Sequence, residues 1–296
     1  MRKAIILLLV LLTVSPTLTL IPRVYSQPGN VIILNYSWRV DSWGVFTVTG
    51  EVQNVGSMTI DTVILKGTVY TKDGNAKAYS EEATCWAKYL LPQQKAPFIM
   101  DFPPRNSLTG DLSWLSLGVD HIDFVVELAE TTSLYQYQNI TIEDSRTTIE
   151  EGFYYVNGTV QNTGDHAAKN IRLVGTFYNA SNIAIATGAS SILDPISLAP
   201  SQTASFWLAA IDLNQTIVPS SFRISSYSLQ VQTEEPIFSG TGSLPANYSK
   251  PVDSSPAQPP SSDSDNLLSS KTVYVIVALL ITIGSASVVL FARKRR

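Results

Sequence analysis

The stretch that decides the fold occurs twice, as Gly-Glu-Val-Gln-Asn-Val-Gly at residues 50–56 and as Gly-Thr-Val-Gln-Asn-Thr-Gly at residues 158–164. Both copies end at Asn-x-Gly, residues that tolerate positive φ or bond their own backbone and so favour a turn. The copies lie 108 positions apart, and the same shift aligns residues 65–70 with 173–178 and 92–98 with 200–206 without a gap. A constant shift over this length predicts two copies of one folding module.

Each copy contains short runs rich in Val, Ile, Thr, Tyr and Phe, separated by turn residues, and neither shows helical periodicity. In copy one we expect strands near residues 31–38, 45–53, 59–71, 83–90, 96–102 and 122–127, and copy two repeats the scheme. We therefore predict an all-β chain of two tandem immunoglobulin-like β-sandwich domains, at residues 27–132 and 133–243, with one C-terminal transmembrane helix. So little chain separates the copies that we expect a semi-rigid pair.

Three motifs of copy two carry a family resemblance: Gly-Thr-Val-Gln-Asn at 158–162, Gly-Thr-Phe-Tyr at 175–178 and Leu-Ala-Pro at 198–200. Together they resemble the FxLYD-type domain. Copy one departs from that pattern at Val69, and copy two has Ser181-Asn182 where the family usually has Asp-Gly. The resemblance implies a small extracytoplasmic β-sandwich of prokaryotic envelope proteins, and it brings no assigned reaction and no catalytic residues.

Both ends of the chain indicate export and anchoring. Residues 1–26 carry Arg2 and Lys3, then an apolar run, then a weaker stretch ending in Ser26, which is typical of a signal peptide. The alternative is an uncleaved N-terminal anchor. At the other end, residues 272–292 predict a transmembrane helix, because residues 273–292 carry no charge and can span about 30 Å of hydrocarbon.

The basic tail at residues 293–296 predicts the orientation of the anchor. Four cations directly after a span favour the cytoplasmic side, so we expect a single-pass protein of the cell membrane with its N-terminal ectodomain outside. Residues 244–271, rich in Pro, Ser and Asp, predict a disordered stalk. Within the helix, Ala278, Thr282 and Ala286 form a small-residue stripe that could pair two copies as a homodimer, although such residues also commonly face lipid.

Charge argues against a nucleic-acid partner. Removing three basic residues with the signal and four with the tail leaves 13 basic residues against 24 acidic ones in the predicted exterior. A duplex would be repelled by this balance. The expected partners are therefore the lipid bilayer and an unidentified envelope protein or glycan.

Six Asn-x-Ser/Thr sequons lie in the predicted exterior, which makes a glycoprotein one interpretation. Chance occurrence in a Ser- and Thr-rich chain is the other. The sequon residues are Asn35, Asn139, Asn157, Asn179, Asn214 and Asn247.

Catalytic, metal and cofactor residues are not predicted. The chain has two histidines, His121 and His166, at positions that are not equivalent in the repeat, so they support neither a histidine metal site nor a repeated Ser-His-Asp triad. Residues 120–123, Asp-His-Ile-Asp, could hold a divalent cation, but such residues more often form the solvated face of a strand. Cys85, the single cysteine, sits in an apolar stretch and is expected in the core.

These features favour a non-enzymatic, membrane-anchored cell-surface protein with a structural or protein-interaction role. The alternative is a receptor or accessory subunit that binds cell-surface glycan or peptide, which requires a concave, aromatic-lined patch on one copy. Candidates for a stacking platform are Trp38, Trp43, Trp86, Trp114 and Trp207.

Overall fold

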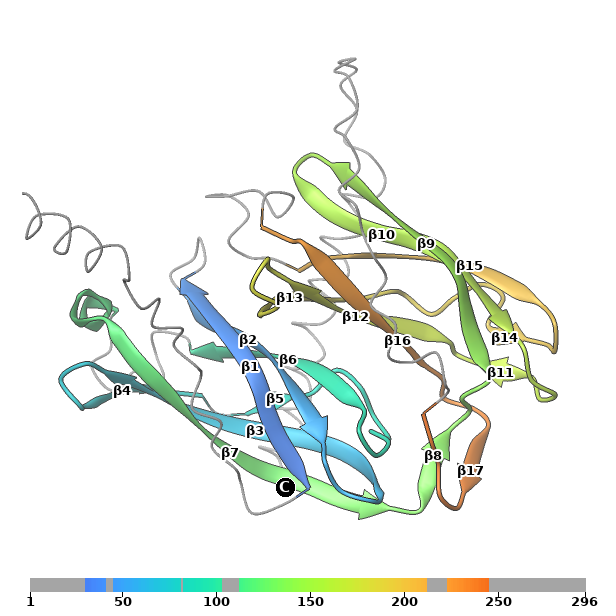
Figure 1. Ribbon diagram of the computed structural model, residues 1–296, viewed down its shortest axis with the longest axis horizontal. Coiled ribbons are helices and arrows are strands. Elements are labelled where there is room, and N and C mark those ends of the chain that lie inside the picture. Colours follow the sequence, from blue (N-terminus) through green and yellow to red (C-terminus); the bar gives the residue numbers. More distant parts are fainter. Residues whose placement is uncertain (1–29, 41–44, 81, 103–111, 212–222, 245–296) are drawn as a thin grey trace, which may run out of the picture.

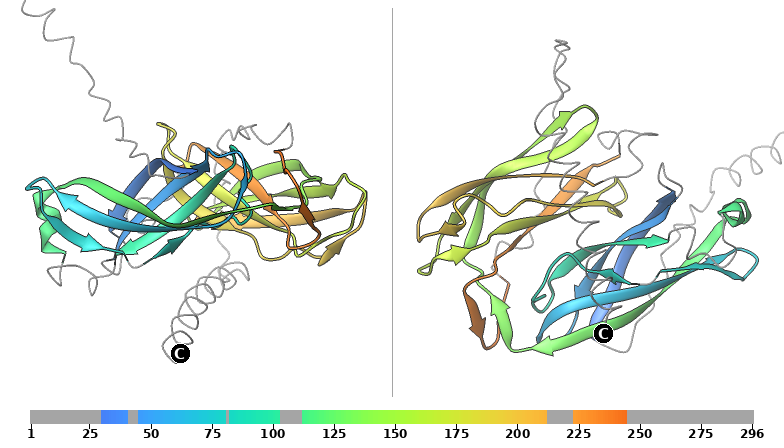
Figure 2. Two further views of the ribbon diagram at one scale, coloured as in Figure 1. Left: turned by 90° about the horizontal axis from the view of Figure 1, so that it is seen from below. Right: turned by 180° about the vertical axis from the view of Figure 1, so that it is seen from behind.

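The computed structural model describes residues 30–40, 45–80, 82–102, 112–211 and 223–244. In this part of the chain the fold is all-β, built from antiparallel strands that form two sandwiches lying side by side (Figures 1 and 2). The predicted strand-rich class is therefore confirmed. Of the other segments predicted from the sequence, residues 1–26 and 272–296 lie outside the described residues, as does all of the 244–271 segment beyond Leu244.

The first sandwich packs two sheets against each other. One sheet has the order β1-β2-β6, formed by β1 (Val31–Val40), β2 (Phe46–Asn54) and β6 (Lys95–Phe102). The other is centred on β3 (Thr59–Thr71), which pairs with β4 (Ala76–Tyr79) and β5 (Ala83–Thr84), and with β7 (Val119–Thr132). The short 3-10 helix η2 (Ser113–Leu117) precedes β7.

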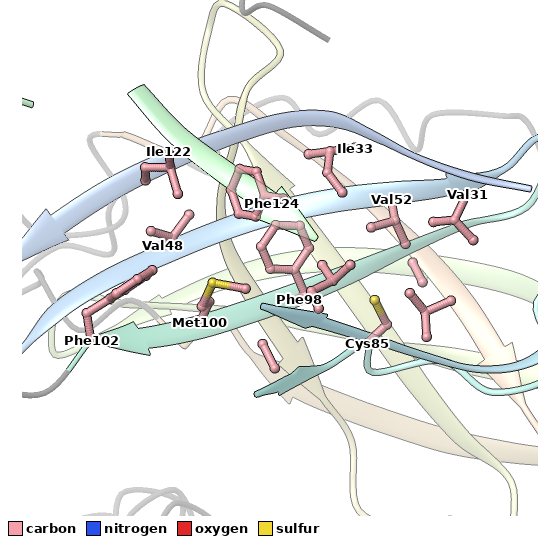
Figure 3. Close-up of a cluster of buried hydrophobic side chains, with 14 of the residues drawn as sticks. Val31, Ile33, Val48, Val52, Cys85, Phe98, Met100, Phe102, Ile122 and Phe124 are labelled. Carbon is pink, nitrogen blue, oxygen red and sulfur yellow. The ribbon is translucent and has the colours of Figure 1, made fainter. Parts of the chain in front are cut away.

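The core of the first sandwich follows from strand alternation, because successive side chains of a strand point to opposite faces. Figure 3 shows this core, where Val48, Phe98 and Phe124 come from three different strands. Cys85 is also buried there, as expected, and burial raises the pKa of its thiol, so the thiol stays protonated.

The second sandwich repeats this arrangement. Its first sheet has the order β15-β10-β9, formed by β9 (Ile140–Glu150), β10 (Phe153–Asn162) and β15 (Thr203–Ala209). Its second sheet has the order β13-β12-β16, formed by β12 (Arg172–Tyr178), β13 (Ala184–Ala189) and β16 (Ser226–Gln232). A small ribbon joins β11 (Ala168–Lys169) to β14 (Ser197–Leu198), and another joins β8 (Leu134–Gln136) to β17 (Ile237–Ser239).

Packing explains why each copy of the repeated stretch begins with glycine, at Gly50 and at Gly158. Gly50 pairs across the strands with Phe98, and Gly158 pairs in the same way with Phe206. A Cβ atom at Gly50 would stand 2.5 Å from the Phe98 ring, and one at Gly158 would stand 2.7 Å from the Phe206 ring. Each glycine therefore leaves room for an aromatic ring over the neighbouring strand.

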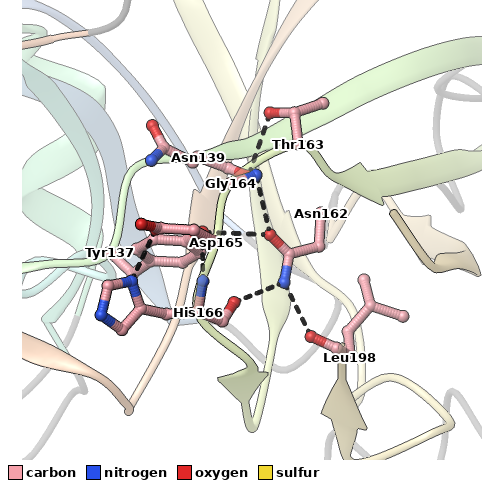
Figure 4. A network of polar contacts seen from close by, with 8 residues as sticks. All are labelled: Tyr137, Asn139, Asn162, Thr163, Gly164, Asp165, His166 and Leu198. Atoms are coloured by element: carbon pink, nitrogen blue, oxygen red, sulfur yellow. Dashed lines mark hydrogen bonds and ion pairs between the residues drawn. The ribbon is translucent and has the colours of Figure 1, made fainter. Parts of the chain in front are cut away.

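The repeated asparagine closes the turn after the strand. The buried Asn54 side chain donates from Nδ2 to the carbonyls of Met58 and Leu90, both at 2.8 Å, and accepts at Oδ1 from the Gly56 amide. The equivalent Asn162 bonds His166, Leu198 and Gly164 in the same pattern (Figure 4). One side chain thus satisfies three backbone groups in each sandwich.

The predicted strand at residues 83–90 differs from the structure. Only β5 (Ala83–Thr84) is a strand there, and Leu90 then forms an isolated bridge with Ile60. The intervening chain is irregular because Trp86 donates its amide to Pro97 and Tyr89 has a φ of 49°. Ala83, Cys85, Ala87 and Leu90 of this stretch are buried in the core. The apolar sequence therefore indicates burial here, but it does not indicate which residues pair as a strand.

We expect Asn54→Ala to destabilise the fold by about 3 kcal/mol, because two buried carbonyls and one amide lose their partner. Chemical denaturation of the wild type and the variant measures this difference. The matched control is Asn75→Ala, at an exposed turn asparagine, with an expected change of about 0.5 kcal/mol or less. Equal effects of the two substitutions would contradict this role for Asn54.

Candidate functional site

A concave, aromatic-lined hollow lies where β8, β17 and the turn after β10 meet. It has a volume of about 370 Å³, and Tyr135, Tyr137, His166 and Phe238 are among the residues that line it. The Phe238 ring lies at the centre of the group, with ring centroids 5.7 Å from Tyr135, 5.9 Å from Tyr137 and 5.4 Å from His166. Aromatic faces gathered around one hollow suit the apolar face of a sugar ring.

The turn network holds two of these rings in place (Figure 4). Tyr137 donates its hydroxyl hydrogen to Asn162 Oδ1 at 3.2 Å, and the same hydroxyl accepts the His166 amide at 3.3 Å. A Cβ atom at Gly164 would overlap the Tyr137 hydroxyl, so only glycine fits beside it. The asparagine that closes the turn therefore also positions the wall of the hollow.

The hollow also has polar groups on its rim. Asp165 Oδ1 lies 2.6 Å from His166 Nδ1, and this hydrogen bond is the main cause that lowers the pKa of the Asp165 carboxyl. Both side chains are exposed, and Gln138 and Asn139 line the same hollow. Carboxylate, imidazole and amide groups can hydrogen-bond the hydroxyls of a ligand that stacks on the rings.

A second feature is the junction between the sandwiches, where β13 lies over β1 and β2. The Ala184 amide donates to Asn35 Oδ1 at 2.8 Å, and the Ala184 carbonyl accepts from Ser37 Oγ at 2.8 Å. Arg39 Nη1 donates to the Ile185 carbonyl at 3.3 Å and to Thr49 Oγ1 at 3.1 Å. The two sandwiches are thus held together by bonds between strands of different domains.

Strand β2 is buried on both of its faces by this junction. Phe46, Val48 and Val52 face the first core, whereas Thr47 and Thr49 on the opposite face are fully buried and Glu51 is 2% exposed. Tyr178 of the second sandwich donates its hydroxyl hydrogen to Glu51 Oε1 at 2.6 Å. A carboxyl group from one domain is therefore enclosed by the other.

The enclosure changes the acidity of both groups. Desolvation by burial raises the pKa of Glu51 above 4.5, although the Tyr178 hydrogen bond and the nearby Lys95 ammonium oppose it. Burial and the adjacent Glu51 carboxylate raise the pKa of Tyr178, so its hydroxyl remains the donor in this pair. Burial thus makes the charged form of Glu51 less favourable in the folded state than in the unfolded chain.

Four of the six sequon asparagines lie in the described residues, in different surroundings. Asn139 is exposed and lines the hollow, while Asn35 is engaged at the junction. Asn157 donates to Thr148 Oγ1 at 2.9 Å, and Asn179 accepts the backbone amides of its own turn. Asn214 and Asn247 lie outside the described residues.

The other candidate groups do not share a site. His121 contacts Asp120 at 2.7 Å and Asp123 at 3.6 Å on the surface of β7, and its ring stacks on Tyr70. Within the described ranges, no group of three or more metal-ligating side chains has metal-site geometry. The tryptophans are dispersed: Trp114 is buried, Trp38 is 45% exposed and stacks on Phe46, and Trp43 lies outside the described residues.

Comparisons with known proteins do not identify a function that could be assigned to this chain. No family model and no curated protein matches the chain. Among solved structures, the Amycolatopsis orientalis exo-chitosanase shares 8% identity with a TM-score of 0.21, over 70% of this chain and 26% of that one. Red sea bream transglutaminase shares 10% identity with a TM-score of 0.21, over 72% of this chain and 31% of that one. Because this chain spans under a third of either structure at such scores, neither likeness carries an argument about function.

We expect Glu51→Gln to raise the melting temperature at neutral pH. The folded-state pKa of Glu51 is raised, so its stability contribution is full below pH 4.5 and is lost as the pH rises through the folded-state pKa. Glutamine keeps an acceptor for Tyr178 without a buried charge. Thermal melts from acidic to neutral pH should show an advantage for the variant that grows with pH.

The matched control for this experiment is Glu127→Gln, at a carboxyl that pairs with Lys66 on the surface at 2.7 Å. It should leave the pH dependence of the melting temperature unchanged, because exposed ion pairs contribute little. If Glu51→Gln lowered the melting temperature at every pH, the charged carboxylate would be the stabilising form and the expected sign would be wrong.

Proposed function

We propose that this chain is a non-enzymatic, membrane-anchored cell-surface protein that presents two β-sandwich domains for structural or protein-interaction roles. The observation that carries the proposal is the charge-free stretch at residues 273–292 followed directly by four cations. A segment of this length and composition is stable across a bilayer, and the cations favour a cytoplasmic tail. In the described ranges no helix is long and apolar enough to cross a membrane, and residues 273–292 lie outside those ranges.

The junction between the sandwiches supports a presenting role. Hydrogen bonds from Tyr178, Ala184 and Arg39 connect the domains, and the Lys88 amide of the first sandwich also donates to Gln232 of the second at 2.9 Å. A pair fixed in this way offers one continuous surface of defined shape to a partner. The excess of acidic residues in the predicted exterior favours a partner with a basic or neutral surface.

Protease added to intact cells should degrade the two sandwiches, because the proposal places them outside. Immunoblotting with an antibody against the second sandwich measures the loss. A variant truncated after residue 271 should be released into the medium, which tests the anchor separately. Sandwiches that survive in whole cells but are lost from lysed cells would contradict the orientation.

A second candidate function is a receptor or accessory subunit for cell-surface glycan. The aromatic hollow favours it, because the partly exposed rings of Tyr135 and Phe238 line one concave space beside exposed polar groups, while Tyr137 is 5% exposed and packs against Phe238. Stacked rings supply affinity for the C–H face of a sugar, and the groups on the rim supply orientation. In this role the rigid turn at Asn162 serves to keep the hollow open.

Under this second function, Tyr135→Ala should weaken binding of cell-wall oligosaccharides about tenfold, because one stacking face is removed. Titration calorimetry on the full chain in detergent measures the affinity. The matched control, Tyr79→Ala, removes a ring that is 45% exposed on the first sandwich and should leave the affinity unchanged. The receptor function is excluded if no oligosaccharide binds at millimolar concentration.

A further inference from the structure

A cleft lies at the junction, and Asn35, Glu51 and Tyr178, which join the sandwiches by hydrogen bonds, form part of its lining. Its volume is about 440 Å³, within the range of small-molecule sites. The first sandwich contributes Glu51 and Lys95, and the second contributes Thr176, Ser228 and Gln230 from its outer sheet face. The cleft is therefore built by both domains and depends on their relative placement.

Two buried polar atoms of residues that line this cleft have no hydrogen-bond partner within 3.5 Å among the described residues: Gln230 Nε2, and Glu51 Oε2, which has Lys95 Nζ as an ion-pair partner at 3.7 Å. Glu51 is 2% exposed and Gln230 is 6% exposed, so bulk water hardly reaches either side chain. Buried polar groups in folded proteins are nearly always paired. The coincidence of two such atoms in one cleft, one from each sandwich, points to a ligand that pairs with both.

The chemistry of the two atoms restricts the ligand. Gln230 Nε2 is a hydrogen-bond donor and an ionised Glu51 Oε2 is an acceptor, so the ligand needs both an acceptor and a donor. Lys95 Nζ lies 3.7 Å from Glu51 Oε2 and balances its charge, which removes the preference for a cationic ligand. The hydroxyl groups of Thr176 and Ser228 complete a lining that suits a neutral ligand with several hydroxyls.

We propose that the cleft binds a neutral sugar residue, with hydroxyl groups that donate to Glu51 Oε2 and accept from Gln230 Nε2. The ligand then bridges the two sandwiches and adds to the direct bond between Tyr178 and Glu51. The polar groups of this site are distinct from those of the aromatic hollow, since neither Glu51 nor Gln230 lines the hollow, although Leu244 borders both. The inference rests on neither proposed function.

The test titrates the full chain in detergent with glucose, galactose, mannose and N-acetylglucosamine, and compares each with its methyl glycoside and oligosaccharides. Glucosamine and glucuronate serve as charged probes. We expect saturable binding of at least one neutral sugar, weakened about tenfold or more by Gln230→Leu, which removes the donor but keeps the size of the side chain. Tighter binding of an oligosaccharide than of the free sugar would identify a glycan chain as the source.

The variants separate loss of the site from loss of the fold. Gln230→Leu should melt at the wild-type temperature or higher without sugar, because it removes an unpaired buried donor. Glu51→Gln, which keeps the acceptor for Tyr178, should also weaken sugar binding. Gln161→Leu, at a partly buried glutamine of β10, is the matched control and should bind as the wild type does.

Three results would overturn the proposal. The first is the absence of binding by every neutral sugar at millimolar concentration. The second is binding that Gln230→Leu and Glu51→Gln leave unchanged, which would place the sugar elsewhere. The third is binding of the charged probes alone, which would show that the cleft takes a different class of ligand.

Discussion

The arrangement of this protein depends on the burial of β2 from both sides. On one face its apolar side chains form the first hydrophobic core, and on the other its polar side chains meet the outer sheet of the second sandwich. A carboxyl group enclosed in this way requires partners, and the Tyr178 hydroxyl supplies one from the other domain. This contact is one of several hydrogen bonds that join the sandwiches, and both of its residues line the cleft.

The fold class was predictable because strand alternation and turn chemistry are local properties. The stretch at residues 50–56 and its copy carry both, and the structure places them in β2 and β10, in equivalent positions of the two sandwiches. Asn54 and Asn162 show why that motif is repeated, since each closes its turn with three hydrogen bonds. Two bonds of each set are local and belong to a turn that can be recognised in the sequence alone, whereas the third joins a carbonyl 36 residues further along the chain.

The covered face of β2 was not predictable in this way. Thr47, Thr49 and Glu51 alternate with apolar residues as the solvated face of a strand would, and only the docking of a second domain makes them interior. The prediction of a strand at residues 83–90 was wrong for a related reason. Its apolar residues are buried, but hydrogen bonds to distant chain segments decide whether a buried stretch is also a strand.

The aromatic hollow was not predicted from the sequence either, because only tryptophans were considered there as stacking groups. Its rings come from Tyr135, Tyr137, His166 and Phe238, and Phe238 lies far along the chain from the others. Pairing between β8 and β17 brings them together. The one signal available in the sequence was the density of aromatic residues just before the second copy, at Tyr135 and Tyr137.

The route of the chain after β17 has a mechanical consequence. Gly242 packs so closely against Leu91 that a Cβ atom there would stand 2.5 Å from the leucine side chain, and Leu244 lines both the hollow and the cleft. The polypeptide therefore departs from the seam between the sandwiches instead of from the far end of one of them. A pulling force applied beyond Leu244 therefore enters the fold at the boundary between the two domains, and reaches β17 (Ile237–Ser239) before any other strand.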